Sequence, residues 1–276
     1  MLKQRLITAI GLIILIGWGV IYLSTPYFAG LVALFVTAGA FEWVRLVNLK
    51  NLWQGTSFAL LVLLIMALLW YFENVFPYVT WIILVIAIIW WIIGIFWVAR
   101  FYNQFVLSSY NVGLRLACGI LLLIPAWLAL VWLHMQYGPI YVFFLLFLTA
   151  VGDSGAFFVG RRWGKNKLAP NISPGKTWEG VWGAVVAVAL YSIIVGIYIL
   201  PYSMLGYRFW SFVLLCLVTL VFSIFGDLFE SMIKRQVGVK DSGNILPGHG
   251  GVLDRIDSLT AAAPVFAFGL MLLEIY

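Results

Sequence analysis

Charged side chains are scarce in this sequence. The 276 residues include 16 basic and 10 acidic side chains, a charged fraction of 9%, whereas soluble domains carry about 25%. Because 64% of the residues are hydrophobic, polar side chains could not cover the surface of a water-soluble globule of this size. The composition excludes a soluble domain and predicts an integral membrane protein.

Cysteine and histidine are nearly absent. Cys118 and Cys216 both lie inside apolar runs, which excludes a disulfide framework and a thiolate metal cluster. The only imidazoles are His134 and His249, too few for a zinc centre of the usual kind. We expect His134 to lie at the outer face of the membrane without a functional role. Any bound metal is expected to be a hard ion held by carboxylates.

Long apolar runs dominate the sequence instead. Runs of about 17 to 25 residues cross a bilayer as helices, because a helix satisfies its own backbone hydrogen bonds in lipid. We place nine spans at 6–24, 26–46, 56–72, 76–98, 112–134, 139–159, 180–200, 209–230 and 259–275. The alternating pattern of a membrane barrel strand is absent. We therefore predict an all-α fold, a polytopic membrane protein with about nine transmembrane helices in one domain, 1–276.

The basic residues predict the orientation of these spans. With the N-terminus in the cytoplasm, 15 of the 16 Lys and Arg residues face the cytoplasm and only Arg208 lies outside, as the positive-inside rule requires. Lys3 and Arg5 precede the first span, and no A-x-A-like cleavage site follows it. We expect this span to be retained as an anchor.

Two predicted cytoplasmic loops carry half of the charge. Residues 160–179 and 231–258 make up 48 positions and hold 13 of the 26 charged side chains. The first half of the chain contains little besides hydrophobic spans. We expect residues 1–138 to form a scaffold and residues 139–276 to form the catalytic half, with its active site at the cytoplasmic ends of the C-terminal helices.

Acidic residues recur where a membrane makes them costly. Asp153 and Asp227 lie at the cytoplasmic ends of predicted spans, and a carboxylate at the bilayer centre costs at least about 2.5 to 3.5 kcal/mol. Glu230 follows Asp227 by three residues and therefore shares its helix face. Asp254 and Asp257 repeat this spacing before the last span. Two acid pairs at one membrane surface indicate a functional site.

Basic side chains and a glycine-rich run accompany these acids. They are Lys176, Lys234, Arg235, Lys240, Arg255 and the sequence Pro-Gly-His-Gly-Gly at 247–251. Carboxylates without histidine or thiolate partners suit Mg²⁺, which completes its octahedron with water and substrate phosphate. A glycine-rich backbone can approach an anion closely. This composition is typical of phosphoryl or nucleotidyl transfer and predicts a phosphorylated substrate.

Some charged residues have simpler explanations. Glu42 and Arg45 are three residues apart, and we expect them to pair at the end of the second span, with a role in a site as the alternative. The Gly-Lys-Thr sequence at 175–177 is not a P-loop, because the G-x-x-x-x-G-K-T pattern requires glycine where the chain has Pro170. Lys50 and Arg100 are expected to reflect topology and attraction to anionic lipid.

One long stretch carries a family resemblance. The sequence reads S-M-I-K-R at 231–235, K-D-S-G at 240–243 and L-P-G-H-G-G-V-L-D-R-I-D at 246–257. This pattern, spread over 27 positions, resembles the signature of the phosphatidate cytidylyltransferases, the CDP-diacylglycerol synthases. Further similarity lies at 153–156, 160–161, 164–168, 173–180 and 226–231. The resemblance covers roughly the C-terminal half of the chain.

The resemblance implies a reaction and its partners. It implies a magnesium-dependent homodimer of the bacterial cytoplasmic membrane that joins CTP and phosphatidic acid into CDP-diacylglycerol and pyrophosphate. Family members are also said to use a monovalent cation such as K⁺. No nucleic-acid partner is expected.

The same resemblance, taken with the residue chemistry, gives each candidate a role. The expected metal ligands are Asp227 and Asp254, with Asp153 and Glu230 as further candidates. The expected catalytic residues are Asp227, Asp254, Lys234, Arg235 and Asp257. The expected substrate-binding residues are Lys176, Ser231, Lys240, His249, Gly250, Gly251 and Arg255.

Three other functions compete with this one. A CTP-dependent polyprenol or lipid kinase would need similar metal and phosphate groups but would release CDP instead of pyrophosphate. A transporter would place polar groups near the midplane of repeated, broken helices, whereas the charges here lie at one rim. A structural membrane scaffold would give no reason for clustered acids.

Overall fold

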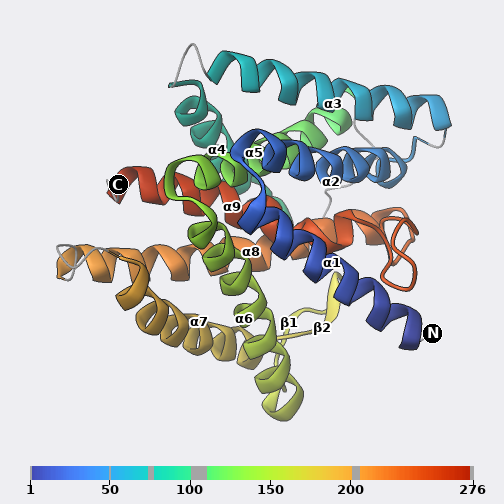
Figure 1. Ribbon diagram of the computed structural model, residues 1–276. Helices are drawn as coiled ribbons and strands as arrows, with labels where there is room; N and C mark the ends of the chain where they lie inside the picture. The colour runs from blue at the N-terminus through green and yellow to red at the C-terminus, as the bar shows by residue number, and fades with distance from the viewer. Residues whose placement is uncertain (1, 50, 74–77, 101–110, 201–205, 274–276) are drawn as a thin grey trace.

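The computed structural model describes residues 2–49, 51–73, 78–100, 111–200 and 206–273. Within these ranges the chain forms nine α-helices and two short strands. The helices are α1 (Leu2–Tyr22), α2 (Thr25–Leu46), α3 (Leu52–Glu73), α4 (Tyr78–Arg100), α5 (Val112–Tyr137), α6 (Pro139–Trp163), α7 (Trp178–Ile199), α8 (Tyr207–Gln236) and α9 (Leu253–Leu273). The strands are β1 (Lys167–Ala169) and β2 (Ser173–Thr177), between α6 and α7 (Figure 1).

These helices confirm the predicted fold class. Among the described residues, α2 to α9 are each long and apolar enough to cross a membrane, and the apolar part of α1, Leu6–Tyr22, is shorter. Their outer faces carry large exposed hydrophobic side chains, which suit contact with lipid. The chain is an all-α polytopic membrane protein.

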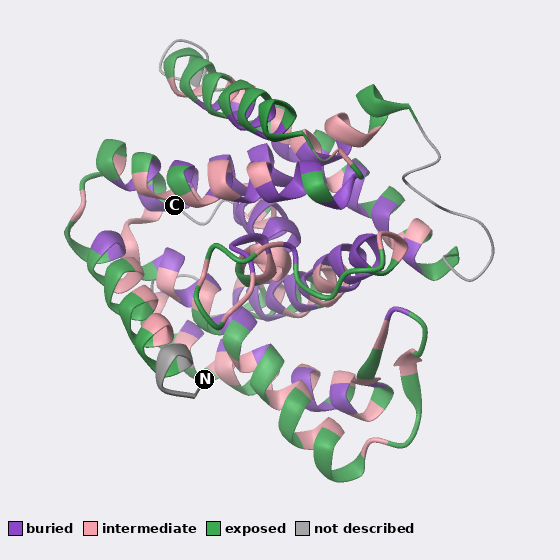
Figure 2. Ribbon diagram, turned by 90° about the vertical axis from the view of Figure 1, so that its right-hand side faces the viewer, coloured by how far each residue is buried: buried purple, intermediate pink, exposed green. Residues whose placement is uncertain are grey.

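Helix α9 lies at the centre of the bundle. It packs against α2, α4, α5, α6 and α8, and most of its residues from Thr260 to Ala267 are buried. Buried segments gather in the middle of the molecule, whereas α6, α7 and the hairpin between them present more exposed residues (Figure 2). The first turns of α9 therefore lie where several helices can supply side chains.

Helix α9 begins earlier than hydropathy predicts. The last apolar run is expected from residue 259, but the helix starts at Leu253, and α8 continues to Gln236. Charged residues lower the hydropathy of the first turns of α9 without preventing helix formation. The connection between α8 and α9 therefore contains only residues 237–252, and Asp254 and Asp257 both extend from the helix.

The other predicted loop, 160–179, contains a β-hairpin. Strands β1 and β2 pair antiparallel, with Lys167 opposite Thr177. The side chain of Asn166 donates to Glu179 over 2.8 Å, and the Thr177 hydroxyl accepts from the backbone N–H of Gly180 over 3.2 Å as the N-cap of α7. These contacts fix the hairpin to the start of α7.

Candidate active site

Three helices meet at the predicted acids. Helix α8 approaches α9 closely at Gly226, where an added Cβ would lie 2.8 Å from the Asp257 carbonyl oxygen. This contact places Asp227 beside the first turns of α9, and Asp257 interacts electrostatically with Asp227. Asp153 on α6 also interacts with Asp227. The structure therefore brings together acids that lie about 100 residues apart in the sequence.

Strand β2 supplies a lysine to this junction. The Lys176 ammonium lies 2.7 Å from Asp227 Oδ2, and both side chains are about a quarter exposed. The Ser231 hydroxyl donates to the other oxygen of Asp227 over 3.2 Å. Three of the predicted site residues therefore contact one another at an accessible position.

A second, buried ion cluster lies one turn further along α8. The Lys234 ammonium lies 2.6 Å from Asp254 Oδ1 and 3.0 Å from Glu230 Oε1, and all three side chains are less than a tenth exposed. The other carboxylate oxygen of Glu230, Oε2, is buried without a hydrogen-bond partner. Because one ammonium group pairs with two buried carboxylates, this cluster holds one negative charge that no positive charge compensates.

Asp254 also organises the connection between α8 and α9. Its Oδ2 accepts from the backbone N–H groups of Ser242 over 2.9 Å and Gly251 over 2.8 Å. The glycine run follows a tight path, with positive φ at Gly248 and Gly250, a conformation that favours glycine. The run lies close to one anion, the carboxylate of Asp254, whereas its approach to a substrate phosphate stays a prediction.

The remaining predicted residues lie around these two clusters. Arg235 donates to the Ile172 carbonyl over 3.3 Å and to the Val239 carbonyl over 3.2 Å, so it connects the hairpin to the end of α8. Arg255 donates to the His249 carbonyl over 3.0 Å, and Lys240 is exposed. Their roles in substrate binding remain predictions.

Glu42 contacts the connection that carries the glycine run, although its spacing favours a pair with Arg45 over a site role. The expected pair with Arg45 is wrong: Glu42 is fully buried and accepts hydrogen bonds from the start of α9, while the Arg45 guanidinium lies over the Phe41 ring. The two side chains leave α2 in different directions, one toward the core and one toward the surface.

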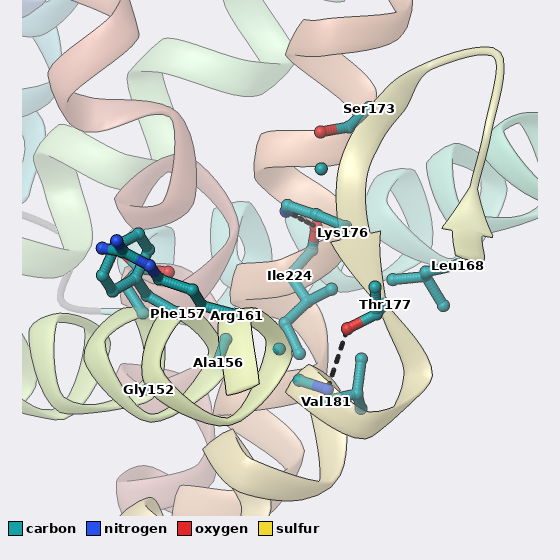
Figure 3. Close-up of a pocket in the computed structure, with 14 residues that line it drawn as sticks. Gly152, Ala156, Phe157, Arg161, Leu168, Ser173, Lys176, Thr177, Val181 and Ile224 are labelled. Carbon is teal, nitrogen blue, oxygen red and sulfur yellow. Dashed lines mark hydrogen bonds between the residues drawn. The ribbon is translucent and has the colours of Figure 1, made fainter. Parts of the chain in front are cut away.

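Two cavities flank Asp153. One has a volume of about 430 Å³ and lies between α6, the hairpin, α7 and α8; Lys176, Thr177 and Arg161 contribute polar groups to it (Figure 3). The other, about 640 Å³, is mostly apolar and lies between α1, α6 and the start of α9. Asp153 lines both cavities, Lys176 lines the smaller one, and Asp254 and Asp257 line the larger one.

The apolar cavity is closed on one side by α1. The Thr8 hydroxyl donates to the Pro247 carbonyl over 3.0 Å, which joins the N-terminal helix to the glycine run. Arg255, His249 and Asp257 line the end of this cavity near the acids. This cavity therefore combines a few acidic and basic side chains with a mostly apolar lining.

The donor chemistry fits a hard cation, although no coordination shell is formed. In the part of the chain that the structure describes, no three His, Cys, Asp or Glu side chains are grouped closely enough to hold a metal ion. Lysine ammonium groups instead lie on Asp227 and between Glu230 and Asp254. Five carboxyl groups share the site with these two lysines, and positions that attract ammonium also attract a metal cation.

Comparisons with known proteins identify the family of this chain. Residues 3–273 match the cytidylyltransferase family. A phosphatidate cytidylyltransferase from Pseudomonas aeruginosa is 42% identical over 97% of this chain and 96% of its own length. One from Haemophilus influenzae is 38% identical over 97% of this chain and 98% of its own length, and one from Bacillus subtilis is 47% identical over about half of each chain. The chain belongs to the cytidylyltransferase family.

Proposed function

We infer that this protein condenses CTP with phosphatidic acid to give CDP-diacylglycerol and pyrophosphate. The family and the full-length relatives support this reaction. The observation that carries it is the position of Asp153 between a cavity that contains Lys176 and Arg161 and a larger, mostly apolar cavity. A water-soluble nucleotide and a membrane lipid can meet at such a boundary.

The reaction needs charge compensation more than proton transfer. The phosphate of phosphatidic acid is already an anion at neutral pH, so it can attack the α-phosphate of CTP without a general base. The obstacle is repulsion between the two anionic groups, and cationic side chains lower it. Lys176 and Arg161, which line the smaller cavity, would contact nucleotide phosphates, and Arg255, which lines the larger cavity, would contact the lipid phosphate.

We propose Mg²⁺ as the metal cofactor. Asp227 and Asp254 would hold it, with Asp153 and Glu230 as further ligands, and the bound ion would neutralise nucleotide phosphate oxygens and the leaving pyrophosphate. The partly exposed Asp227 carboxylate and the incompletely bonded Glu230 support this proposal. A monovalent cation such as K⁺ remains a prediction from the family resemblance.

The products and the metal requirement can be tested in one assay. We expect purified protein in detergent, given labelled CTP, phosphatidic acid and Mg²⁺, to release pyrophosphate and form CDP-diacylglycerol. Excess chelator should reduce the rate to background, and added Mg²⁺ should restore it. Release of CDP would identify a lipid kinase and contradict the proposed reaction, whereas a rate unaffected by chelator would contradict only the metal.

We propose that the apolar cavity holds the acyl chains of phosphatidic acid. Gly17 on α1 lines this cavity, and an added Cβ there meets no atom within 4 Å. Gly17→Leu should therefore fill lipid space without disturbing the helix and raise the KM for phosphatidic acid about tenfold, which corresponds to about 1.4 kcal/mol of lost binding. The KM for CTP should not change.

Gly11→Leu is a matched control for the lipid site. Gly11 lies on the same helix and also has open space around it, but it is not among the residues that line the apolar cavity. We expect this variant to keep the wild-type KM for both substrates. An equal change in both variants, or a change in the KM for CTP, would argue against lipid binding in this cavity.

We also propose the cellular placement and assembly that the sequence predicts. The asymmetry of basic residues supports a multi-pass protein of the bacterial cytoplasmic membrane, with the N-terminus and the active site facing the cytoplasm. Asp227, Lys234 and Asp254 lie toward the helix ends that this orientation places at the cytoplasmic surface. The family resemblance supports a homodimer.

A further inference from the structure

The Glu42 carboxylate, near the end of α2, is bonded entirely to a distant part of the chain. It accepts from the Ser242 hydroxyl over 3.0 Å, from the Val252 N–H over 3.1 Å and from the Leu253 N–H over 2.9 Å. Both carboxylate oxygens are used, and the side chain is fully buried. These partners lie 200 or more residues from Glu42 in the sequence.

The glycine run leaves room for this carboxylate. A Cβ added at Gly243 would overlap Glu42 Oε1, and a Cβ added at Gly251 would overlap Glu42 Oε2 and the Ser242 hydroxyl. Neither glycine has a positive φ, so backbone conformation alone does not require glycine there. Close approach of the loop to Glu42 does require it.

Glu42 supplies what the first turn of α9 lacks. The first N–H groups of a helix have no partner within the helix, and a negative charge near them is favourable because of the helix dipole. Val252 and Leu253 provide such N–H groups at the start of α9. A residue of α2 therefore caps α9, and the buried carboxylate is compensated by three donors.

The same loop is held from its other side by Asp254. Ser242 donates its hydroxyl to Glu42 and its backbone N–H to Asp254. Gly251 donates to Asp254 and passes next to Glu42. The carboxylates of Glu42 and Asp254 thus hold the loop 242–253 from its two sides. Because the loop donates to Asp254, it also orients this carboxylate toward Lys234.

We propose that Glu42 is a positioning residue for cytidylyl transfer. It holds the 242–253 loop and the start of α9, and so orients Asp254 and Asp257 at the reaction site. This inference rests on the proposed roles of those aspartates. The nearest acid of the site in the sequence, Asp153, lies 111 residues after Glu42, so only the fold brings Glu42 to the site.

Glu42→Gln tests this role while conserving side-chain shape. The amide keeps one acceptor oxygen and turns a donor toward at least one N–H group of the loop. We expect kcat/KM, normalised to folded protein, to fall about 10- to 100-fold, as for partners that orient metal ligands. The half-saturating Mg²⁺ concentration should rise, and amide hydrogen exchange in 242–253 should become faster without substrate or metal.

Two further variants complete the experiment. Arg45→Gln removes a charge one turn further along α2, at an exposed side chain outside the site, and should leave rate and exchange unchanged. Ser242→Ala removes a single donor to Glu42 without altering a buried charge. As in Glu42→Gln, exchange in 242–253 should become faster and kcat/KM should fall, here by about threefold. This variant tests the role even if Glu42→Gln does not fold.

The outcomes separate this inference from the proposed site. Unchanged exchange in both the Glu42 and Ser242 variants would overturn the positioning role, whatever the rate. Faster exchange with a normal kcat/KM would show that the order of the 242–253 loop does not matter for the reaction. That result would overturn the positioning role of Glu42. Pyrophosphate release by the wild-type protein tests the reaction itself independently of these results.

Discussion

Asp227→Asn is expected to lower turnover by at least about 100-fold at saturating Mg²⁺. The change removes a negative charge from the accessible carboxylate that pairs with Lys176, and the loss of one preorganised electrostatic contact at a reaction centre typically costs this much. The volume of the side chain hardly changes. Initial rates of CDP-diacylglycerol formation, measured over a range of Mg²⁺ and CTP concentrations, check the prediction.

The Asp227 variant should remain folded. Both members of the pair are about a quarter exposed, and breaking such an ion pair costs about 1 kcal/mol or less. Glu73→Gln is a suitable control, because it also removes one negative charge, at the end of α3 in the first half of the chain. The control should keep the wild-type rate, and near-normal turnover in Asp227→Asn would contradict the role assigned to this carboxylate.

Asp254→Asn is expected to abolish turnover and also to destabilise the protein. Its carboxylate accepts from Lys234, Ser242 and Gly251, and the amide cannot accept at both oxygen positions. Each unsatisfied buried donor costs about 1 to 3 kcal/mol. Lys234 is less than a tenth exposed and would retain only Glu230 as an acidic partner.

Thermal unfolding distinguishes the two aspartate variants. We expect Asp254→Asn to lower the unfolding midpoint, followed by tryptophan fluorescence, by about 5 °C or more, and Asp227→Asn to leave it nearly unchanged. Both variants should lack activity. An unchanged midpoint in Asp254→Asn would contradict its role in organising the loop, and normal turnover would contradict its role in the reaction.

The sequence predicts the membrane fold because hydropathy and charge asymmetry report directly on lipid contact. The apolar runs identify the spanning helices, and the three-residue spacing of acids identifies one helix face for Asp227 and Glu230. The approach of Asp257 follows from packing of α8 against α9 at Gly226, and that of Asp153 from packing of α6 against α8 at Gly152. The common membrane depth of these acids already indicates that they could meet.

Helix ends and the hairpin were harder to predict, since hydropathy does not mark where a helix begins in water or at a membrane surface. Charged residues occupy the first turns of α9 and the last turn of α8, so the apolar window ends too early for α8 and begins too late for α9. Strands β1 and β2 contain only three and five residues. Such short strands leave no recognisable periodicity.

The role of Glu42 could not be found from local spacing. The expected pair with Arg45 follows a rule for neighbours on an isolated helix surface, whereas burial against α9 gives Glu42 stronger donors. The one available signal was an acid inside the apolar first half of the chain. Its partners depend on tertiary contacts over about 200 residues, which a single sequence does not reveal.

The metal position tests the central claim most directly. We propose locating it by anomalous diffraction from crystals grown with CTP and Mn²⁺, which like Mg²⁺ favours carboxylate and phosphate oxygens. The account predicts an anomalous peak bonded to Asp227, next to the triphosphate in the cavity lined by Lys176. A peak remote from Asp227, with CTP bound elsewhere, would contradict it.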